Sequence, residues 1–349
     1  ETGGNSVNHI IKSGIRGVEF ICANTDSQDL AKVQKAKKIK LGKDFTKGLG
    51  AGNDPERGRV ATKESIPEIK EALEHTEMLF IVAGMGGGTG TGGAPVVAKI
   101  AKDLGILTVA IVTTPFKYEL EKRAEQAEAG IAKLMQSVDS LIEIDNEKIF
   151  EIFPENAQFK EGFNAVNEVI ANAVRGVSNV ILNPATMNVD FADVQAAMSQ
   201  KGMAIMCIGK ASGPNRAAAA VDDALGNPFF NRAEVKNAKG LLVNICGPSG
   251  MEMQEINEIM THAQKISQQG VEAIPGLTID ESFGDEISVI IIATGLRKFN
   301  QKLIDEFSTS YIRPVRDLPP SNTKENQGFV DPDKLKRIDI LEVIRSIEN

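Results

Sequence analysis

The order of apolar and polar positions along the first 150 residues predicts short buried strands that alternate with longer amphipathic helices. Apolar runs at 18–22, 78–83, 106–112 and 141–144 have the length of strands. Helical patterns lie between them, at 57–75, 95–104 and 119–135, and the second has a proline near its predicted first turn. This alternation is typical of a mostly parallel sheet covered by helices on both faces.

The pattern changes after residue 159. A nearly unbroken helical stretch is predicted over 160–182, and a second series of elements follows it. That series comprises helices at 191–200, 215–225 and 251–267 and strands at 203–209, 241–246, 274–279 and 287–294, the last two predicted to pair.

These patterns together predict an α/β fold in four parts. A Rossmann-like parallel-sheet domain spans 1–159, a long central helix spans 160–182, and a smaller α/β domain spans 183–295. Apolar residues then become sparse and prolines more frequent, so 296–349 is predicted to be a linker and tail.

Composition narrows the class of protein. The net charge of −8 over 349 residues argues against a general nucleic-acid-binding protein, which would carry a basic face. Cys22, Cys207 and Cys246 form no C-x-x-C pair and lie in or beside apolar runs, so buried thiols in a reducing cytoplasm are expected. No apolar run has the length of a membrane span, so direct membrane insertion is not expected.

The segment 84–93 contains seven glycines and lies between a predicted strand and a predicted helix. Glycine lets the backbone approach an anion closely, and a helix start offers unpaired N–H groups. Thr89 and Thr91 add hydroxyl groups. The segment therefore predicts a phosphate-binding loop, and the alternative is a tight turn without a ligand.

Two common nucleotide-binding motifs do not fit this loop. A Walker A motif requires Lys followed by Ser or Thr after the last glycine, and neither follows here. A dinucleotide-binding motif requires an acidic residue near the end of the next strand, which instead reads Val112-Thr113-Thr114.

Residues 86–92, with the sequence GGGTGTG, resemble the signature of the tubulin/FtsZ superfamily of GTPases. In that family the loop binds the phosphates of GTP. The similarity extends from about Gly3 to Gly295. It implies a tubulin-type fold that binds GTP and GDP, with Mg²⁺ held mainly by the nucleotide and no metal ligand assigned to the protein.

The resemblance also implies a set of nucleotide-binding residues. They are Gly3, Gly4, Asn5, Asn24, Asp26, Gly50, Ala51, Gly52, Gly86, Gly87, Gly88, Thr89, Gly90, Thr91, Gly92, Glu119, Arg123, Asn146, Phe163 and Asn167. In the family, the first eight lie in loops around the phosphates and metal. Glu119 and Arg123 correspond to groups at the ribose and beside the nucleotide, and the last three to groups around guanine.

The residues alone leave simpler alternatives open for four of these positions. Glu119 and Arg123 are four apart, which also suits an ordinary ion pair on a helix. Phe163 also suits core packing, and Asn167 suits a solvated helix face.

The segment 188–193 resembles the catalytic loop of the family, which enters the nucleotide pocket of the neighbouring subunit. The resemblance implies that Asp190 and Asp193 polarise the attacking water and help to hold the cation, and that Asn188 assists the geometry. From the residues alone, helix capping by the two acids is the simpler interpretation.

The resemblance thus implies a GTPase that polymerises head to tail into filaments of the cytokinetic ring, in the cytoplasm at the division site. The implied partners are further copies of the chain, membrane adaptors and assembly regulators. The alternatives are a divergent relative that binds GTP or GDP without turnover or assembly, and a nucleotide-dependent oxidoreductase.

The chain departs from the family pattern in several places. Glu1 and Thr2 stand where the family has glycines, and Leu120 stands where it often has glycine. No residues correspond to the strand that precedes Gly3 in the family, and an absent strand is expected to leave sheet edges open. The tail segment 331–337 is only loosely similar to the adaptor-binding motif of the family.

Overall fold

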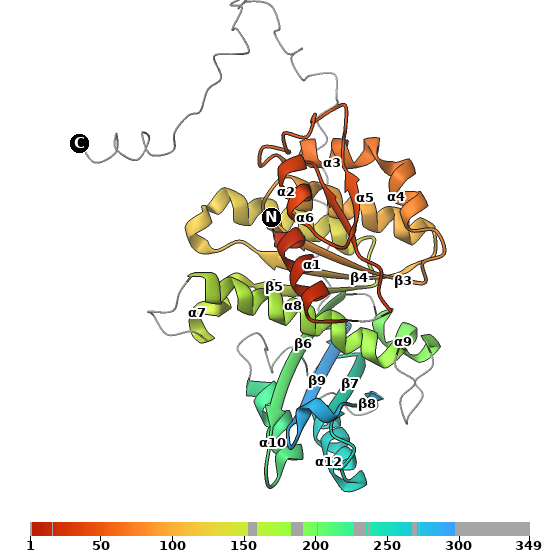
Figure 1. Cartoon of the computed structure of the whole chain (residues 1–349), viewed down its shortest axis with the longest axis vertical. Coiled ribbons are helices and arrows are strands. Elements are labelled where there is room, and N and C mark those ends of the chain that lie inside the picture. Colours follow the sequence, from red (N-terminus) through yellow and green to blue (C-terminus); the bar gives the residue numbers. More distant parts are fainter. Residues whose placement is uncertain are drawn as a thin grey trace, which may run out of the picture. The chain divides into compact units, whose positions relative to one another are not determined.

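The first part of the chain forms parallel strands that alternate with helices, as the apolar pattern predicts (Figure 1). The structure, a computed structural model, describes residues 2–15, 17–152, 159–182, 191–200, 202–226, 235, 237–266, 271 and 273–296. Its first five strands are β1 (Ile21–Asn24), β2 (Lys37–Lys40), β3 (Met78–Gly84), β4 (Leu107–Thr114) and β5 (Ser140–Asp145). β4 lies between β3 and β5, and all of its residues except the last are buried.

Helices cover both faces of these strands. They are α1 (Thr2–Lys12), α2 (Ser27–Lys32), α3 (Pro55–Glu64), α4 (Ile66–Ala72), α5 (Thr89–Asp103), α6 (Glu121–Met135) and α7 (Ile149–Ile152). Successive side chains of a strand point to opposite faces. Ala110 and Val112 of β4 accordingly belong to a buried cluster with α5 and α6. Val109 and Ile111 belong to a different cluster, on the other face.

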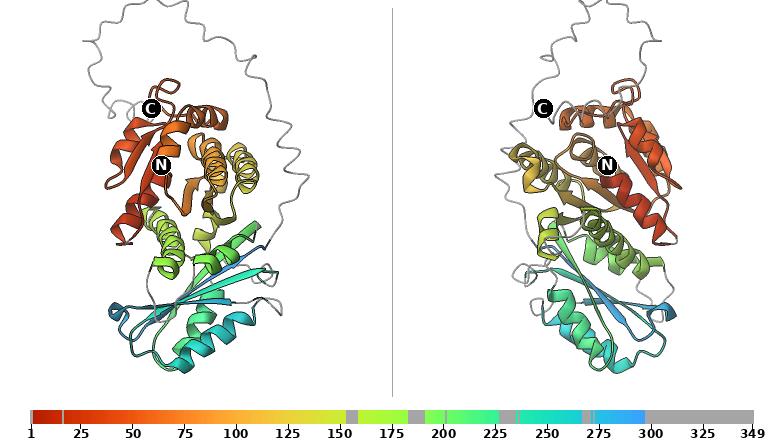
Figure 2. Two further views of the ribbon diagram at one scale, coloured as in Figure 1. Left: turned by 90° about the vertical axis from the view of Figure 1, so that its right-hand side faces the viewer. Right: turned by 60° about the vertical axis from the view of Figure 1, so that its left-hand side comes forward.

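The predicted central helix is present as α8 (Phe159–Leu182), and it lies between the parallel strands and the C-terminal sheet (Figure 2). Val166, Ile170 and Val174 recur at every fourth position and belong to one buried cluster with residues from both halves of the chain. None of the described helices is long and apolar enough to cross a membrane.

The strand β6 (Gly202–Ala211) also joins the two halves. Its first three residues pair with β5 in parallel, and its last seven pair with β9 (Ile287–Thr294) in antiparallel orientation. The described residues therefore form one compact unit. The domain boundaries predicted at 159 and 183 stay a prediction.

The C-terminal sheet has the strand order β6-β9-β7-β8, in which β7 is Gly240–Gly247 and β8 is Ala273–Ile279. The predicted pairing of 274–279 with 287–294 is wrong, because both strands pair with β7 on its opposite edges. All eight residues of β9 are buried, whereas β8 is partly exposed. A strand that is apolar on both faces is most stable in a central position, and β8 takes the edge.

Helices complete the C-terminal part. α9 (Phe191–Met198), α10 (Arg216–Gly226) and α12 (Met253–Gln264) match the predicted helical stretches to within a few residues. α10 and α12 form a buried cluster with one face of the sheet. Val194 and Met198 of α9 instead belong to the cluster that contains α8.

Several predicted element boundaries are wrong. The stretch 57–75 forms two helices, separated at Ser65, because Pro67 provides no backbone N–H for a continuous helix. α5 begins at Thr89 rather than at residue 95, so the glycine-rich segment itself supplies its first turn. The first strand lies at Ile21–Asn24 rather than at 18–22, and α1, α2 and β2 were not predicted.

The parallel strands do not form one continuous sheet. β1 pairs only with β2, and β3 is the last strand of the seven-stranded sheet. Within the described residues, β1 and β3 therefore each have one edge without a strand partner. A cavity extends between these edges, where Cys22, Leu79 and Ile81 line it.

The three cysteines are buried, as predicted. Burial raises the pKa of Cys207 to about 12 and that of Cys246 to about 11, and it also raises the pKa of Cys22. We expect a thiol reagent at pH 8 to label Cys207 and Cys246 at least about 100-fold more slowly in the folded protein than in the unfolded chain, because the thiolate is the reacting species. Labelling of Cys207 in the folded protein as fast as in the unfolded chain would contradict its burial.

Candidate functional site

The predicted nucleotide-binding loops meet where the parallel strands end. Asp26 follows β1, Gly86 follows β3, Glu119 follows β4 and Asn146 follows β5. The carboxyl ends of parallel strands are the usual place for a ligand in an open α/β sheet. A cavity of about 1280 Å³ opens at these loops and continues between β1 and β3.

The glycine-rich loop leads directly into α5. Gly88 is the residue before the helix, and no side chain caps the first N–H groups of α5. Within the loop, the Gly86 N–H donates to Thr91 Oγ1 at 2.8 Å, which fixes the turn. A Cβ atom at Gly87 would meet nothing within 4 Å. At Gly87 and Gly88 the loop therefore presents backbone without a side chain to the cavity.

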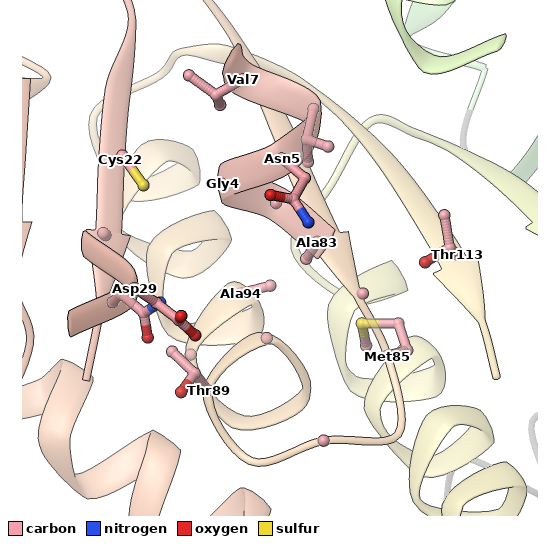
Figure 3. Close-up of a pocket in the computed structure, with 18 of the residues that line it drawn as sticks. Gly4, Asn5, Val7, Cys22, Asp29, Ala83, Met85, Thr89, Ala94 and Thr113 are labelled. Carbon is pink, nitrogen blue, oxygen red and sulfur yellow. The ribbon is translucent and has the colours of Figure 1, made fainter. Parts of the chain in front are cut away.

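The loop is braced by its neighbours. Thr25 and Thr89 share a hydrogen bond of 2.6 Å between their hydroxyl oxygens. A Cβ atom at Gly92 would lie 1.9 Å from the Pro55 carbonyl oxygen, so α5 can approach α3 this closely only with glycine at that position. Figure 3 shows Gly4 and Asn5 of α1, Asp29 of α2 and Thr89 of α5 around the cavity, with Met85 in the loop.

Two further loops line the same part of the cavity. Asp26 caps α2 by accepting hydrogen bonds from the backbone N–H groups of Gln28 and Asp29. Gly50 and Gly52 have positive φ angles of 83° and 62°, in a segment that ends at the helix cap Asp54. Glycine adopts positive φ angles more readily than other residues, so this turn favours glycine at both positions.

Glu119 and Arg123 form an ion pair beside the cavity. The Phe116 N–H donates to Glu119 Oε1 at 3.1 Å, and Arg123 Nη2 donates to Asn53 Oδ1 at 3.2 Å. The predicted helix from 119 begins only at Glu121, so the pair spans a short 3₁₀ turn (Lys117–Glu119) and the start of α6. The two side chains thus connect the loops that follow β4 and precede α3.

Leu120 lies between that turn and α6 with φ 78° and ψ 147°. Residues other than glycine rarely adopt this conformation, and it costs roughly 1–3 kcal/mol. The 3₁₀ turn before Leu120 and the hydrogen bond that the Arg123 N–H donates to the Leu120 carbonyl oxygen hold this residue in its conformation.

An aromatic group lies at the other end of the cavity. Phe163 of α8 lines the cavity, and its ring centroid lies 5.6 Å from that of the buried Phe116. Asn167, one turn further along α8, also lines the cavity, and its Oδ1 accepts a hydrogen bond from Ser6 Oγ at 2.8 Å. Asn146 Oδ1 is buried at the cavity without a hydrogen-bond partner.

These features suit a purine nucleotide. The backbone N–H groups of the glycine-rich loop and of the first turn of α5 suit a polyphosphate. The aromatic ring of Phe163 offers a stacking surface, and the unpaired Asn146 Oδ1 can accept from an N–H group of a base. The carboxylates of Asp26 and Asp29 line the cavity on the phosphate side, where oxygen ligands suit Mg²⁺.

The structure brings together most of the residues that the resemblance implied. All of the implied nucleotide-binding residues line the cavity except Gly86, Thr91 and Gly92, which shape and brace the loop. Asp193 is exposed on α9 and does not line the cavity. Asn188 and Asp190 lie outside the described residues, as does Glu1.

Sequence reasoning missed three residues at the site. Asp29 lines the cavity together with Asp26, Asn53 receives the Arg123 hydrogen bond, and the exposed Tyr118 ring stacks on Phe116 with centroids 4.9 Å apart. Asn53 has φ 58°, a conformation that asparagine tolerates. Its position directly after Gly52 was the sequence feature that could have indicated a role at the site.

Known proteins resemble this chain over most of its length. A family model described as the GTPase domain of the tubulin/FtsZ family matches residues 1–154, and one described as the C-terminal domain of the FtsZ family matches residues 202–297. A cell division protein FtsZ from Pseudomonas aeruginosa is 46% identical over 294 residues, which are 84% of this chain and 75% of the relative. The same protein from Buchnera aphidicola is 43% identical over 333 residues, covering 95% of this chain and 86% of the relative.

Solved structures of FtsZ and related proteins also resemble this chain. An empty FtsZ dimer from M. jannaschii has a TM-score of 0.80 and 40% identity, covering 85% of this chain and 86% of that one. A GTPγS-bound protofilament of CetZ2 from Haloferax volcanii, 20% identical with a TM-score of 0.73 over 88% of this chain and 95% of that one, shares the fold. This chain belongs to the FtsZ family of tubulin-like GTPases, and its guanine-nucleotide-binding domain is the part that carries the cavity.

Proposed function

We propose that this GTPase polymerises head to tail into filaments of the cytokinetic ring at the division site, and that each GTP is hydrolysed at the interface between two subunits. In this proposal one subunit binds the nucleotide in the cavity. The next subunit contributes Asp190, Asp193 and Asn188. Membrane adaptors and assembly regulators are its further partners.

The placement of Asp193 is the observation that carries the proposal. Phe163 lines the cavity near the amino end of α8, and Leu182 ends the helix 19 residues later, which corresponds to about 28 Å at 1.5 Å per residue. Figure 1 shows α9, which bears Asp193, beside the carboxyl end of α8 and α7 at its amino end. Asp193 is exposed on α9 and does not line the cavity of its own chain. A second copy can bring this acid to the cavity.

The division of roles follows from phosphoryl-transfer chemistry, which mainly requires positioning and charge stabilisation. The backbone N–H groups of the loop 86–90 hold the phosphates. Glu119 holds the ribose through its carboxylate, and Arg123 anchors the loop that contains Asn53. Phe163 stacks on guanine, and Asn146 and Asn167 read its edge. Asp190 and Asp193 of the neighbour accept hydrogen bonds from the attacking water and orient it.

Mg²⁺ would be held mainly by the phosphates, and among the described residues Asp26 and Asp29 provide carboxylates that line that side of the cavity. A bound Mg²⁺ neutralises the charge that develops on the phosphate oxygens. Loss of the γ-phosphate contacts then weakens the interface, so the filament can turn over.

The proposal predicts a threshold in the rate of hydrolysis. With Mg²⁺ and saturating GTP, the rate per molecule is expected to be near zero at low protein concentration and to rise steeply above a critical concentration, because a head-to-tail contact completes each site. A rate per molecule that is independent of concentration would instead show a self-contained site. Tight GTP binding without turnover at any concentration would favour a divergent, non-assembling relative.

A further inference from the structure

A buried hydrogen bond joins α1 to α8 at the base end of the cavity. Ser6 Oγ donates to Asn167 Oδ1 at 2.8 Å, across 161 positions of the sequence. Asn167 lines the cavity, whereas Ser6 does not. Any effect of the Ser6 side chain on a bound nucleotide therefore passes through residues that do line the cavity, such as Asn167.

Packing alone does not account for a serine at this position. Ser6 is fully buried, and Ile10, one turn further along α1, belongs to the buried cluster that includes Val166 and Ile170 of α8. A hydroxyl group in such an apolar contact is unfavourable unless it forms a hydrogen bond, whereas alanine would bring no polar group to be satisfied. The bond to Asn167 offsets this cost, so the serine has a physical reason at the amide group rather than in the core.

The bond also restricts the rotation of the Asn167 side chain. The last torsion angle of asparagine has only broad preferences, so an amide group without such a partner samples a wide range of orientations. With Oδ1 bonded to Ser6, the second lone pair of Oδ1 and the two N–H donors of Asn167 remain for a ligand. Asn146 differs, because its buried Oδ1 has no hydrogen-bond partner among the described residues. The base end of the cavity thus has one amide group that is already oriented before a nucleotide binds.

We propose that Ser6 is a positioning residue for guanine recognition, and that its hydroxyl group holds the Asn167 amide group in the orientation that binds the Watson–Crick edge of guanine. The inference rests on the proposed function, in which Asn167 reads that edge. Guanine has an acceptor at O6 and a donor at N1, whereas adenine has a donor at N6 and an acceptor at N1. An amide group held in one orientation matches only one of these two edges, so Ser6 contributes to the preference for GTP over ATP.

A double-mutant cycle separates this role from packing between the two helices. Ser6→Ala, Asn167→Ala and the double variant are assayed for GTP and ATP affinity, by competition with a fluorescent GTP analogue at low protein concentration. Ser6→Cys is a second variant, which keeps the volume of the side chain and replaces the hydroxyl group by a weaker donor. Glu168→Ala is the matched control, because Glu168 also contacts α1, through His9 at 2.7 Å, and does not line the cavity. The melting temperature of each variant shows that it is folded.

We expect Ser6→Ala and Ser6→Cys to lower GTP affinity about five-fold, the effect of losing one hydrogen bond, and to change ATP affinity by less than about two-fold. The preference for GTP over ATP should fall accordingly. In the Asn167→Ala background, Ser6→Ala should have no further effect on GTP affinity, because no amide group is left to position. Glu168→Ala, which removes a partly exposed ion pair, should keep both affinities within about two-fold of wild type.

Three results would overturn the inference. An unchanged preference for GTP in Ser6→Ala, with a reduced preference in Asn167→Ala, would remove the role of Ser6 and leave that of Asn167 intact. An unchanged preference in both variants would also remove Asn167 from the reading of guanine. A loss of GTP affinity in Ser6→Ala that persists in the Asn167→Ala background, or that ATP affinity shares, would show that Ser6 serves only the packing of α1 against α8.

Discussion

Replacement of Asp193 by alanine is expected to lower GTP turnover by at least about 100-fold while GTP binding stays at the wild-type level. The reason is that the Asp193 carboxylate lies on α9, outside the cavity of its own chain, and is proposed to act only in the site of the neighbouring subunit. Hydrolysis at saturating GTP and nucleotide affinity by fluorescence titration are the two measurements. Gln195→Ala, at an exposed position on the same helix, is the matched control and should retain activity.

A mixing experiment tests the shared site directly. Thr89→Ala impairs the nucleotide loop, and Asp193→Ala leaves the nucleotide loop intact. Mixed filaments then contain interfaces in which an intact cavity of one variant faces an intact acid of the other. The mixture should therefore hydrolyse GTP faster than the sum of the two separate variants. Strict additivity of the two rates would rule out a site shared between subunits.

The substitution Gly92→Ala is expected to destabilise the protein by about 3 kcal/mol or more, because its Cβ atom would overlap the Pro55 carbonyl oxygen and force α5 away from α3. Chemical denaturation monitored by circular dichroism measures the change. Since the glycine loop is the start of α5, GTP affinity should fall with stability. An unfolding free energy within about 0.5 kcal/mol of wild type would show that the two helices are not packed as described.

Gly87→Ala is the matched control within the same loop. Its Cβ atom would meet no protein atom within 4 Å, so the unfolding free energy should change by no more than about 0.5 kcal/mol. The added methyl group would nevertheless stand where the loop faces the cavity, and GTP affinity should fall about ten-fold as backbone N–H groups are kept from the phosphates. Unchanged affinity would remove Gly87 from the phosphate site.

Much of the site was predictable because its glycine-rich loop is one continuous segment of the sequence. Seven glycines within ten residues, between a strand and a helix, already predict an anion-binding loop. The resemblance to a GTPase family then supplied nucleotide-binding residues from distant segments, and all of those outside the loop line one cavity. Phe163 and Asn167 met this expectation because a helix places residues four apart on one face.

Roles within the loop were not predictable. Thr91 has the same residue type as Thr89, yet its hydroxyl accepts the Gly86 N–H inside the turn, whereas Thr89 bonds to Thr25 at the cavity. Gly92 is required by the approach of α3, a segment more than 30 residues earlier in the sequence. The role of each of these residues depends on which segment packs against it. The periodicity of the sequence does not indicate that packing.

The sequence by itself determined the alternation of strands and helices, the long helix over 160–182 and the existence of a phosphate-binding loop, because these follow from local periodicity and residue type. Only the tertiary structure decided that β9 lies between β6 and β7, that Leu120 adopts a strained conformation, and that Asp193 does not line the cavity of its own chain. The physical reason is that strand order and distances between elements follow from burying apolar faces against one another across the whole chain, which is a property of the packed fold rather than of any one segment.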